Sequence, residues 1–414
     1  MILSWREFLV RFALVFFCFA LWPKGFMYWG VALLVVAWLV DGGLFRFRGL
    51  LKEPLVLGIL IFCGVWVVGL LWSDLAVAFQ DRWRKYFLLL AFLPLYSLLN
   101  KERLPWAVGG LAGSYSTMVA LGGYSWSMQG MQGVPLFGMI HLHYSAALGI
   151  GVILAIFGSW VVLAKGNKFL TVLLWLVALL LLFLQFHQNS RGFLLTTLVT
   201  SLLMFYLYYR TEGKLLLRSV ISILAVAMLF AATSDAFHER LEAAKSDLQL
   251  SRQGNYQTSV GYRLAIWDIG LHGIAERPLL GHGSGMAKQY LKDSYITYKQ
   301  GIYRNLSEFH EARHFHNELI EIGIHLGLLG ILAFAFLLWS WFKTFRQHQM
   351  TLLGSAIVCF IFLSGLTDTF LITNRIPPFL LAVTAIAVCW QKYNRGLDLV
   401  DRKNLQIENI TQNP

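Results

Sequence analysis

The chain has little charge, and none of its cysteines lies in a polar segment. Charged residues make up 14% of its 414 residues, whereas a soluble domain of average composition has about 25%. The sequence therefore does not fit an ordinary soluble enzyme. Because the cysteines all fall within apolar runs, neither a disulfide framework nor a cysteine metal site is expected. The cysteines are Cys18, Cys63, Cys359 and Cys389.

Long apolar runs fill most of the chain. Hydrophobic residues make up 57% of it, and the mean hydropathy is +0.61. A helix needs about 20 apolar residues to cross a bilayer core, and continuous rather than alternating runs favour helices over barrel strands. We predict an all-α integral membrane protein with about twelve transmembrane helices and a large, partly helical loop before the last three. The expected spans are about 8–22, 25–41, 54–72, 83–99, 106–123, 143–164, 169–187, 193–209, 219–235, 319–342, 351–368 and 376–391.

The distribution of basic residues predicts the orientation, because basic short loops stay in the cytoplasm. The net charge is +12. Seventeen Lys and Arg residues lie at the two termini and in alternate short loops, and six lie in the short loops of the other side. Both termini are therefore expected in the cytoplasm, and the charge requires no nucleic-acid partner. The expected divisions are helices one to nine (1–235), an outer loop subdomain (236–317), helices ten to twelve (318–392) and a cytoplasmic tail (393–414).

Arg191 breaks this charge rule. It lies on the outer side, in a very short loop between two nearly pure apolar runs. An arginine there needs an anion or a water-filled cleft, and Gly192 permits a tight turn and the close approach of a ligand. Arg263 begins an amphipathic stretch of the large loop. Because guanidinium groups bind phosphate bidentately, Arg191 and Arg263 are predicted to hold a phosphate-bearing ligand.

A second outer cluster of basic residues, Arg82, Arg84 and Lys85, opens the fourth span. We assign Arg82 to lipid headgroups, toward which long basic side chains extend. Arg84 and Lys85, together with Arg313 of the large loop, are candidates for extending the anion site.

The string Arg-His-Phe-His-Asn ends the large loop, where the chain re-enters the apolar region. Histidine is the side chain whose ordinary pKa suits base catalysis near neutral pH. His316 is the predicted general base, and His314 competes for that role or contacts the substrate. Asn317 is expected to cap the following helix and to lie beside the substrate. Glu318 or Glu321, near the positive end of that helix, can orient a histidine.

Three other patterns have competing interpretations. His310–His314 matches H-E-x-x-H, a zinc-protease motif, but it has no clear third ligand, so no metal is predicted. The run Gly281–Gly285 lacks the lysine of a P-loop and is either a turn that approaches a ligand or a simple loop. Asp368, with Asn374 and Arg375 nearby, is either part of a second polar cluster or, as we favour, pairs with Arg375 to cap helix ends.

These motifs and the helix layout resemble the O-antigen ligases, within the wider O-antigen ligase/polymerase superfamily. Ser-Arg-Gly at 190–192 looks like the arginine motif of a short periplasmic loop in that family, and Tyr-Arg-Leu at 262–264 like its second arginine motif. Gly281–Gly285 resembles its glycine turn. The stretch from His316 to Gly330 is similar to its most diagnostic segment. The resemblance covers most of the chain.

The resemblance implies a GT-C-like glycosyltransferase of the bacterial inner membrane with a periplasmic active site. The donor would be O-antigen on undecaprenyl pyrophosphate, and the acceptor a hydroxyl of the lipid A–core oligosaccharide. His316 would be the base, while Arg191 and Arg263 would hold the pyrophosphate without a metal or other cofactor. No carboxylate pair of the glycosidase kind is evident, so a single inverting displacement is expected. Membrane lipids are the other expected partners.

Other functions stay open. A polymerase or a protein O-oligosaccharyltransferase of the same superfamily differs only in its acceptor. A lipid-linked glycan transporter also has many spans, but transporters place ionisable residues near mid-membrane. Here the spans are nearly free of charge and polar residues collect at the outer face, which favours chemistry at that face.

Overall fold

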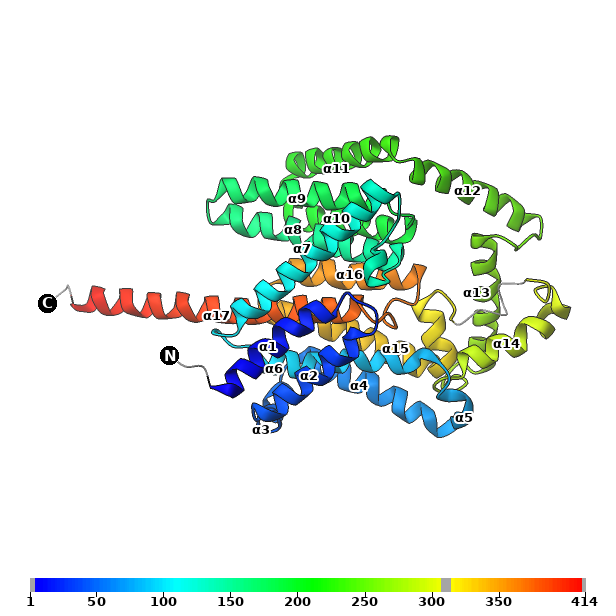
Figure 1. Ribbon diagram of the computed structural model, residues 1–414, viewed down its shortest axis with the longest axis horizontal. Helices are drawn as coiled ribbons and strands as arrows, with labels where there is room; N and C mark the ends of the chain where they lie inside the picture. Colours follow the sequence, from blue (N-terminus) through cyan, green and yellow to red (C-terminus); the bar gives the residue numbers. More distant parts are fainter. Residues whose placement is uncertain (1–3, 307–313, 412–414) are drawn as a thin grey trace.

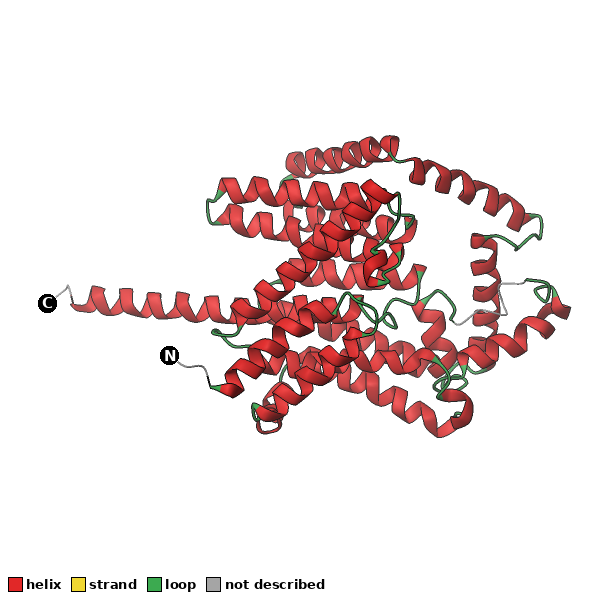
Figure 2. Ribbon diagram, viewed as in Figure 1, coloured by secondary structure: helices red, strands yellow, loops and turns green. Residues whose placement is uncertain are grey.

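Helices make up nearly all of the fold. The computed structural model describes residues 4–306 and 314–411 (Figure 1, Figure 2). No β-strand occurs in these residues, although Val134 and Met139 form an isolated antiparallel bridge. The helices are α1 (Trp5–Ala20), α2 (Phe26–Val40), α3 (Gly43–Leu50), α4 (Pro54–Val68), η1 (Gly69–Trp72), α5 (Leu75–Ala78), η2 (Arg82–Ala91), α6 (Phe92–Leu98), α7 (Leu104–Gln129), η3 (Pro135–Phe137), α8 (His141–Ala164), α9 (Lys168–Phe186), α10 (Arg191–Tyr209), α11 (Gly213–Thr233), α12 (Asp235–Arg252), α13 (Ser259–Glu276), α14 (Ala287–Thr297), η4 (Tyr298–Gly301), α15 (Glu318–Gln347), α16 (Thr351–Thr367) and α17 (Ile376–Thr411).

The predicted all-helical fold is confirmed, and the apolar helices are consistent with a membrane protein. Within the described residues, seven helices are long and apolar enough to cross a membrane, or eight if the bent pair α2 and α3 forms one span. The number twelve stays a prediction. The fourth expected span differs most from expectation, because it is a 3₁₀-helix, η2, followed by the short helix α6.

The chain ends and the large loop lie at opposite ends of the molecule. Figure 1 shows the N- and C-termini at the left and α13 and α14 at the right. Apolar side chains of α13, α14 and the segment that begins α15 form a second core. This core includes Ile266, Leu291, Phe315 and Ile320. The segment between the ninth and tenth expected spans is therefore packed onto the bundle through its own core.

Helix α15 is broken at Gly327, where φ is 57° and ψ is −147°. The break frees backbone N–H groups, and a membrane interior requires that such groups find partners within the protein. The N–H of Leu328 donates to Pro278 O at 2.8 Å, and the N–H of Leu329 donates to Leu279 O at 3.1 Å. The loop before α14 is thereby fixed to the middle of α15.

The glycine turn Gly281–Gly285 continues this attachment. Gly281, Gly283 and Gly285 all have positive φ, which glycine adopts without steric cost. The N–H of Gly283 donates to His325 O at 2.8 Å, and a Cβ on Gly281 would lie 2.5 Å from the carbonyl carbon of His325. The turn brings backbone close to backbone, which supports the simple-loop alternative over a ligand-binding turn.

A buried ion-pair cluster joins the helices at the end that carries the termini. Arg103, which is 7% exposed, lies 2.7 Å from Glu7 Oε2 and 3.0 Å from Asp41 Oδ1. Asp41 also pairs with Arg6 and Arg46. Because Asp41 is itself buried, loss of Arg103 leaves a carboxylate partly uncompensated.

We expect Arg103→Met to lower the free energy of unfolding by about 2 kcal/mol, because hydrogen bonds to buried charges are lost. The measurement is thermal unfolding in detergent micelles. The matched control is Lys245→Met, which removes an exposed pair with Glu242 and should change stability little. Equal melting temperatures for Arg103→Met and the wild type would contradict this role.

Candidate active site

The start of α15 and the end of α16 bring two site residues together. Asn317 Oδ1 accepts hydrogen bonds from the N–H groups of Leu319 and Ile320, at 3.0 and 3.2 Å, so the predicted helix cap is confirmed. Asn317 Nδ2 donates to Leu366 O, near the end of α16, at 3.3 Å. His316 and Asp368, which flank these two anchor points, are therefore held side by side.

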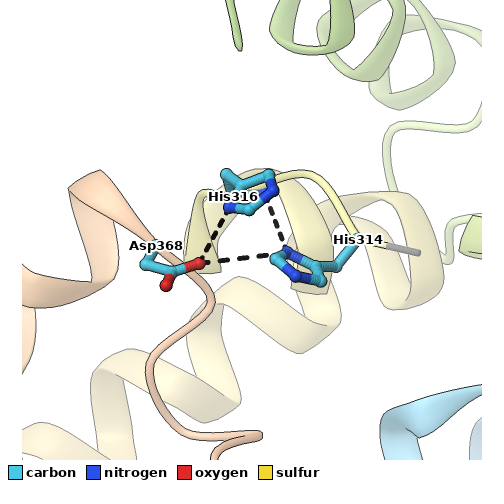
Figure 3. A group of neighbouring side chains, drawn as sticks. All are labelled: His314, His316 and Asp368. Atoms are coloured by element: carbon cyan, nitrogen blue, oxygen red, sulfur yellow. Dashed lines mark hydrogen bonds and ion pairs between the residues drawn. The ribbon is translucent and has the colours of Figure 1, made fainter. Parts of the chain in front are cut away.

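His316 Nδ1 lies 3.0 Å from Asp368 Oδ1 (Figure 3). Burial acts to raise the pKa of Asp368, but the hydrogen bond from His316, the two neighbouring histidines and the N–H of Thr369 together outweigh it and lower this pKa to about 2. An ionised carboxylate can only accept a hydrogen bond, so the proton of His316 lies on Nδ1. In the neutral form of the ring, Nε2 then carries the lone pair, which is the arrangement of an oriented general base.

His314 is held in a different state. Its Nδ1 accepts the N–H of His316 at 3.3 Å and lies 3.1 Å from Thr369 Oγ1. Burial, together with the neighbouring His316, lowers the pKa of His314 to about 3. His314 is therefore neutral near pH 7, and its Nδ1 supports the backbone turn on which His316 is placed. His316 adopts a positive φ of 49° in this turn, which is uncommon for a residue other than glycine.

His314, His316 and Asp368 also form a set that could hold a metal ion. Their ligand atoms all lie within 4.8 Å of one another (Figure 3). Nδ1 of each histidine and Oδ1 of Asp368 already make the contacts described above, so a metal would replace those hydrogen bonds. The zinc-protease interpretation cannot be compared with the geometry, because His310 to Arg313 lie outside the described residues.

Arg191 and Arg263 line one cavity of about 250 Å³ together with Asp368. Arg191 is the first residue of α10, and Arg263 lies on α13. The start of a helix favours anions, because backbone N–H groups and the helix dipole point outward there. Ser190 Oγ, also in the lining, is buried and makes no hydrogen bond to the described residues. The cavity can thus accommodate a ligand that carries negative charge.

His316 and Asp368 both line a second cavity of about 460 Å³. The two cavities share Asp368 and Leu142. Arg82 and Lys85 line the second cavity. They are three residues apart on the 3₁₀-helix η2, which has three residues per turn and so presents both on one side. Arg82 is thus a further candidate for the anion site, and its assignment to lipid headgroups stays a prediction.

Several other expected contacts are absent from the described part of the site. Arg84 lines neither cavity, and its guanidinium lies over the ring of Phe79, 6.0 Å from its centre. Arg313 lies outside the described residues. Arg375 donates to Phe137 O and Gly138 O and does not form the expected ion pair with Asp368.

The two glutamates at the start of α15 do not orient His316. Glu318 accepts the hydroxyl of Tyr86 at 2.5 Å and the N–H of Leu371 at 2.8 Å. Glu321 accepts the N–H of Phe315 at 2.8 Å. Both side chains hold neighbouring segments together through these hydrogen bonds. Asp368, not a glutamate, makes the contact with His316.

Gly192 serves helix packing. A Cβ at this position would lie 2.9 Å from Thr367 Oγ1 and 3.1 Å from Thr367 Cβ. Helix α16, rather than a ligand, thus makes the close approach to Gly192. This contact brings Arg191 near Asp368, the residue after Thr367.

Parts of the chain are similar in sequence to known O-antigen ligases. A family model described as O-antigen ligase matches residues 176–335. The chain is 28% identical over 178 residues to the O-antigen ligase of Escherichia coli K12, covering 42% of this chain and 40% of that protein. It is 29% identical over 119 residues to an uncharacterized protein of Haemophilus influenzae, covering 27% and 28% of the two chains.

These matches support the assignment of the chain to the O-antigen ligase superfamily. The matched parts span about two fifths or less of these relatives. The family match includes Arg191, Arg263 and His316, whereas Asp368 lies beyond its end. In the sequence, the signal for Asp368 was only a lone carboxylate at the end of an apolar run.

We expect Gly192→Ala to lower stability by about 1–3 kcal/mol, because the added methyl group overpacks the contact between α10 and α16. Thermal unfolding in detergent measures the change. Gly213→Ala is the matched control, because a Cβ there meets no atom within 4 Å. If Gly192→Ala melts no lower than Gly213→Ala, the helices do not need this close contact.

Proposed function

We propose that this superfamily member is an O-antigen ligase of the bacterial inner membrane. It transfers O-antigen polysaccharide from undecaprenyl pyrophosphate to a hydroxyl of the lipid A–core oligosaccharide at the periplasmic face. The observation that carries this proposal is the cavity shared by Arg191, Arg263 and Asp368, with His316 only 3.0 Å from Asp368. Two cations for a diphosphate thus adjoin an oriented base.

The reaction proceeds as one displacement at the anomeric carbon of the donor sugar. His316 Nε2 removes the proton of the acceptor hydroxyl while its oxygen forms a bond to that carbon. The bond from the carbon to the pyrophosphate oxygen breaks, and the leaving undecaprenyl pyrophosphate takes the electron pair. Arg191 and Arg263 stabilise the charge that develops on it. Asp368 stabilises the positive charge that His316 gains.

The carboxylate inventory supports inversion. Among the described residues that line the arginine cavity, Asp368 is the one carboxylate, and it is engaged by His316. A double displacement requires a nucleophile and a separate acid and base, which retaining glycosidases supply with two carboxyl groups. Direct attack by the acceptor needs only the base and the anion site.

The proposal is tested in a strain that lacks the gene and is complemented with variants. We expect Arg191→Ala to reduce ligation by about 10²–10³-fold, because one oxyanion-type contact is removed. His316→Ala should reduce it by about 10²–10⁴-fold, because general base catalysis is lost. Electrophoresis of lipopolysaccharide should show core without O-antigen, with polymer left on its lipid carrier.

Two controls make this test specific. Arg252→Ala, at an exposed position of α12, should retain ligation, and membrane levels of every variant are measured by immunoblotting. If His314→Ala abolishes ligation while His316→Ala does not, the base is misassigned. Short O-antigen chains still attached to core in the deletion strain would indicate a polymerase instead.

We also expect ligation by the purified protein to stay within about twofold when it is assayed in excess chelator, because the arginines supply the charge stabilisation that metals give elsewhere. This measurement is decisive because His314, His316 and Asp368 lie close enough together to hold a metal ion. Loss of activity that zinc restores would show that they hold a metal.

A further inference from the structure

Basic residues dominate the second cavity, beyond what the leaving group requires. Four cationic side chains line it, and Asp368 is the one carboxylate in the described lining. Asp368 already accepts from His316. The four are Lys24, Arg82, Lys85 and Arg375.

Arg375 is the most informative of these side chains. It is 8% exposed, and burial lowers its pKa. Its Nη2 donates to Phe137 O at 2.8 Å and to Gly138 O at 3.1 Å, but it forms no ion pair within the described residues. Lys85, which is half-buried in the same lining, also forms no ion pair within the described residues. Buried charges are normally paired, so Arg375 indicates an anionic ligand, and Lys85 supplies a second cation for it.

Neutral polar atoms in the same cavity indicate a second property of that ligand. Asn374 Oδ1 and His143 Nδ1 are buried and make no hydrogen bond to the described residues. Both residues line the cavity. The Asn374 oxygen can only accept a hydrogen bond, so its natural partner is a hydroxyl or amide of the ligand. A saccharide that bears phosphate or carboxylate groups combines the two properties.

We propose that the second cavity binds the acceptor through phosphate or carboxylate groups that flank its reactive hydroxyl. This assignment rests on the proposed ligase function. The donor pyrophosphate occupies the cavity of Arg191 and Arg263, and the acceptor reaches His316 from the second cavity. The two substrates then meet at the His316–Asp368 pair, because Asp368 lines both cavities and His316 lines the second.

The test is a steady-state measurement with the full-length protein in liposomes, purified lipid-linked donor and purified acceptor glycolipid. Initial rates are measured while each substrate is varied in turn. Lys85→Gln and Arg375→Gln should each raise the KM for the acceptor about tenfold or more, because charge-assisted hydrogen bonds are lost. The KM for the donor should stay within about twofold. Arg263→Gln should show the reverse pattern.

A chemically altered acceptor provides the matched control. After the acceptor is treated with a phosphatase, or its carboxylates are reduced, Lys85→Gln should no longer differ from the wild type by more than about twofold in acceptor KM. Lys24→Gln, at an exposed position of the same cavity lining, gives a third variant that leaves the buried packing intact. Thermal unfolding confirms that each variant is folded.

The outcomes separate this inference from the proposed function. If Lys85→Gln and Arg375→Gln raise the donor KM instead, the cavity holds the pyrophosphate and the acceptor assignment is overturned. Unchanged KM values for both substrates also overturn it, while ligation itself stands. If the wild-type protein transfers nothing to this acceptor, the ligase function fails, and the subsite assignment fails with it.

Discussion

A hydrogen bond of 3.0 Å between Asp368 Oδ1 and His316 Nδ1 joins the elements on which the candidate site is built. It exists because Asn317 both caps α15 and donates to the last turn of α16. The bond places the proton of His316 on Nδ1 and directs the basic Nε2 away from the carboxylate. Both cavities share Asp368 in their lining, so this single contact defines where two ligands can meet.

The surrounding packing serves to hold that contact. Gly192 lets α10 approach α16, so that Arg191 lies in the same cavity as Asp368. The break of α15 at Gly327 lets the loop before α14 bond to the middle of the helix. The core formed by α13, α14 and the start of α15 then fixes Arg263 relative to His316. Backbone contacts through glycines thus position side chains that are distant in sequence.

The helices, the cap at Asn317 and the grouping of two arginines could be predicted from the sequence, each for a physical reason. Continuous apolar runs predict helices because the bilayer permits little else, and Asn317 before such a run predicts a cap. Arg191 and Arg263 were grouped because of their chemistry, and they line one cavity. Asp368 was missed as the partner of His316, because the partner comes from another helix 52 residues away and the nearby glutamates offered a local alternative.

The other differences also have physical causes. Arg82 was assigned to lipid headgroups because long basic side chains extend toward them, and the structure places it with Lys85 in the lining of the second cavity. The glycines at 192 and 281–285 signalled close approach correctly, but a single sequence does not show whether a ligand or another segment of backbone approaches. Arg375 was paired with Asp368 by charge alone, and it binds two carbonyl groups instead.

The most direct measurement is an experimental structure of the protein in lipid with undecaprenyl pyrophosphate bound. The account requires density for the diphosphate between the guanidinium groups of Arg191 and Arg263, next to the Asp368–His316 pair. A diphosphate bound elsewhere, with this cavity empty or with His316 separated from Asp368, would contradict it.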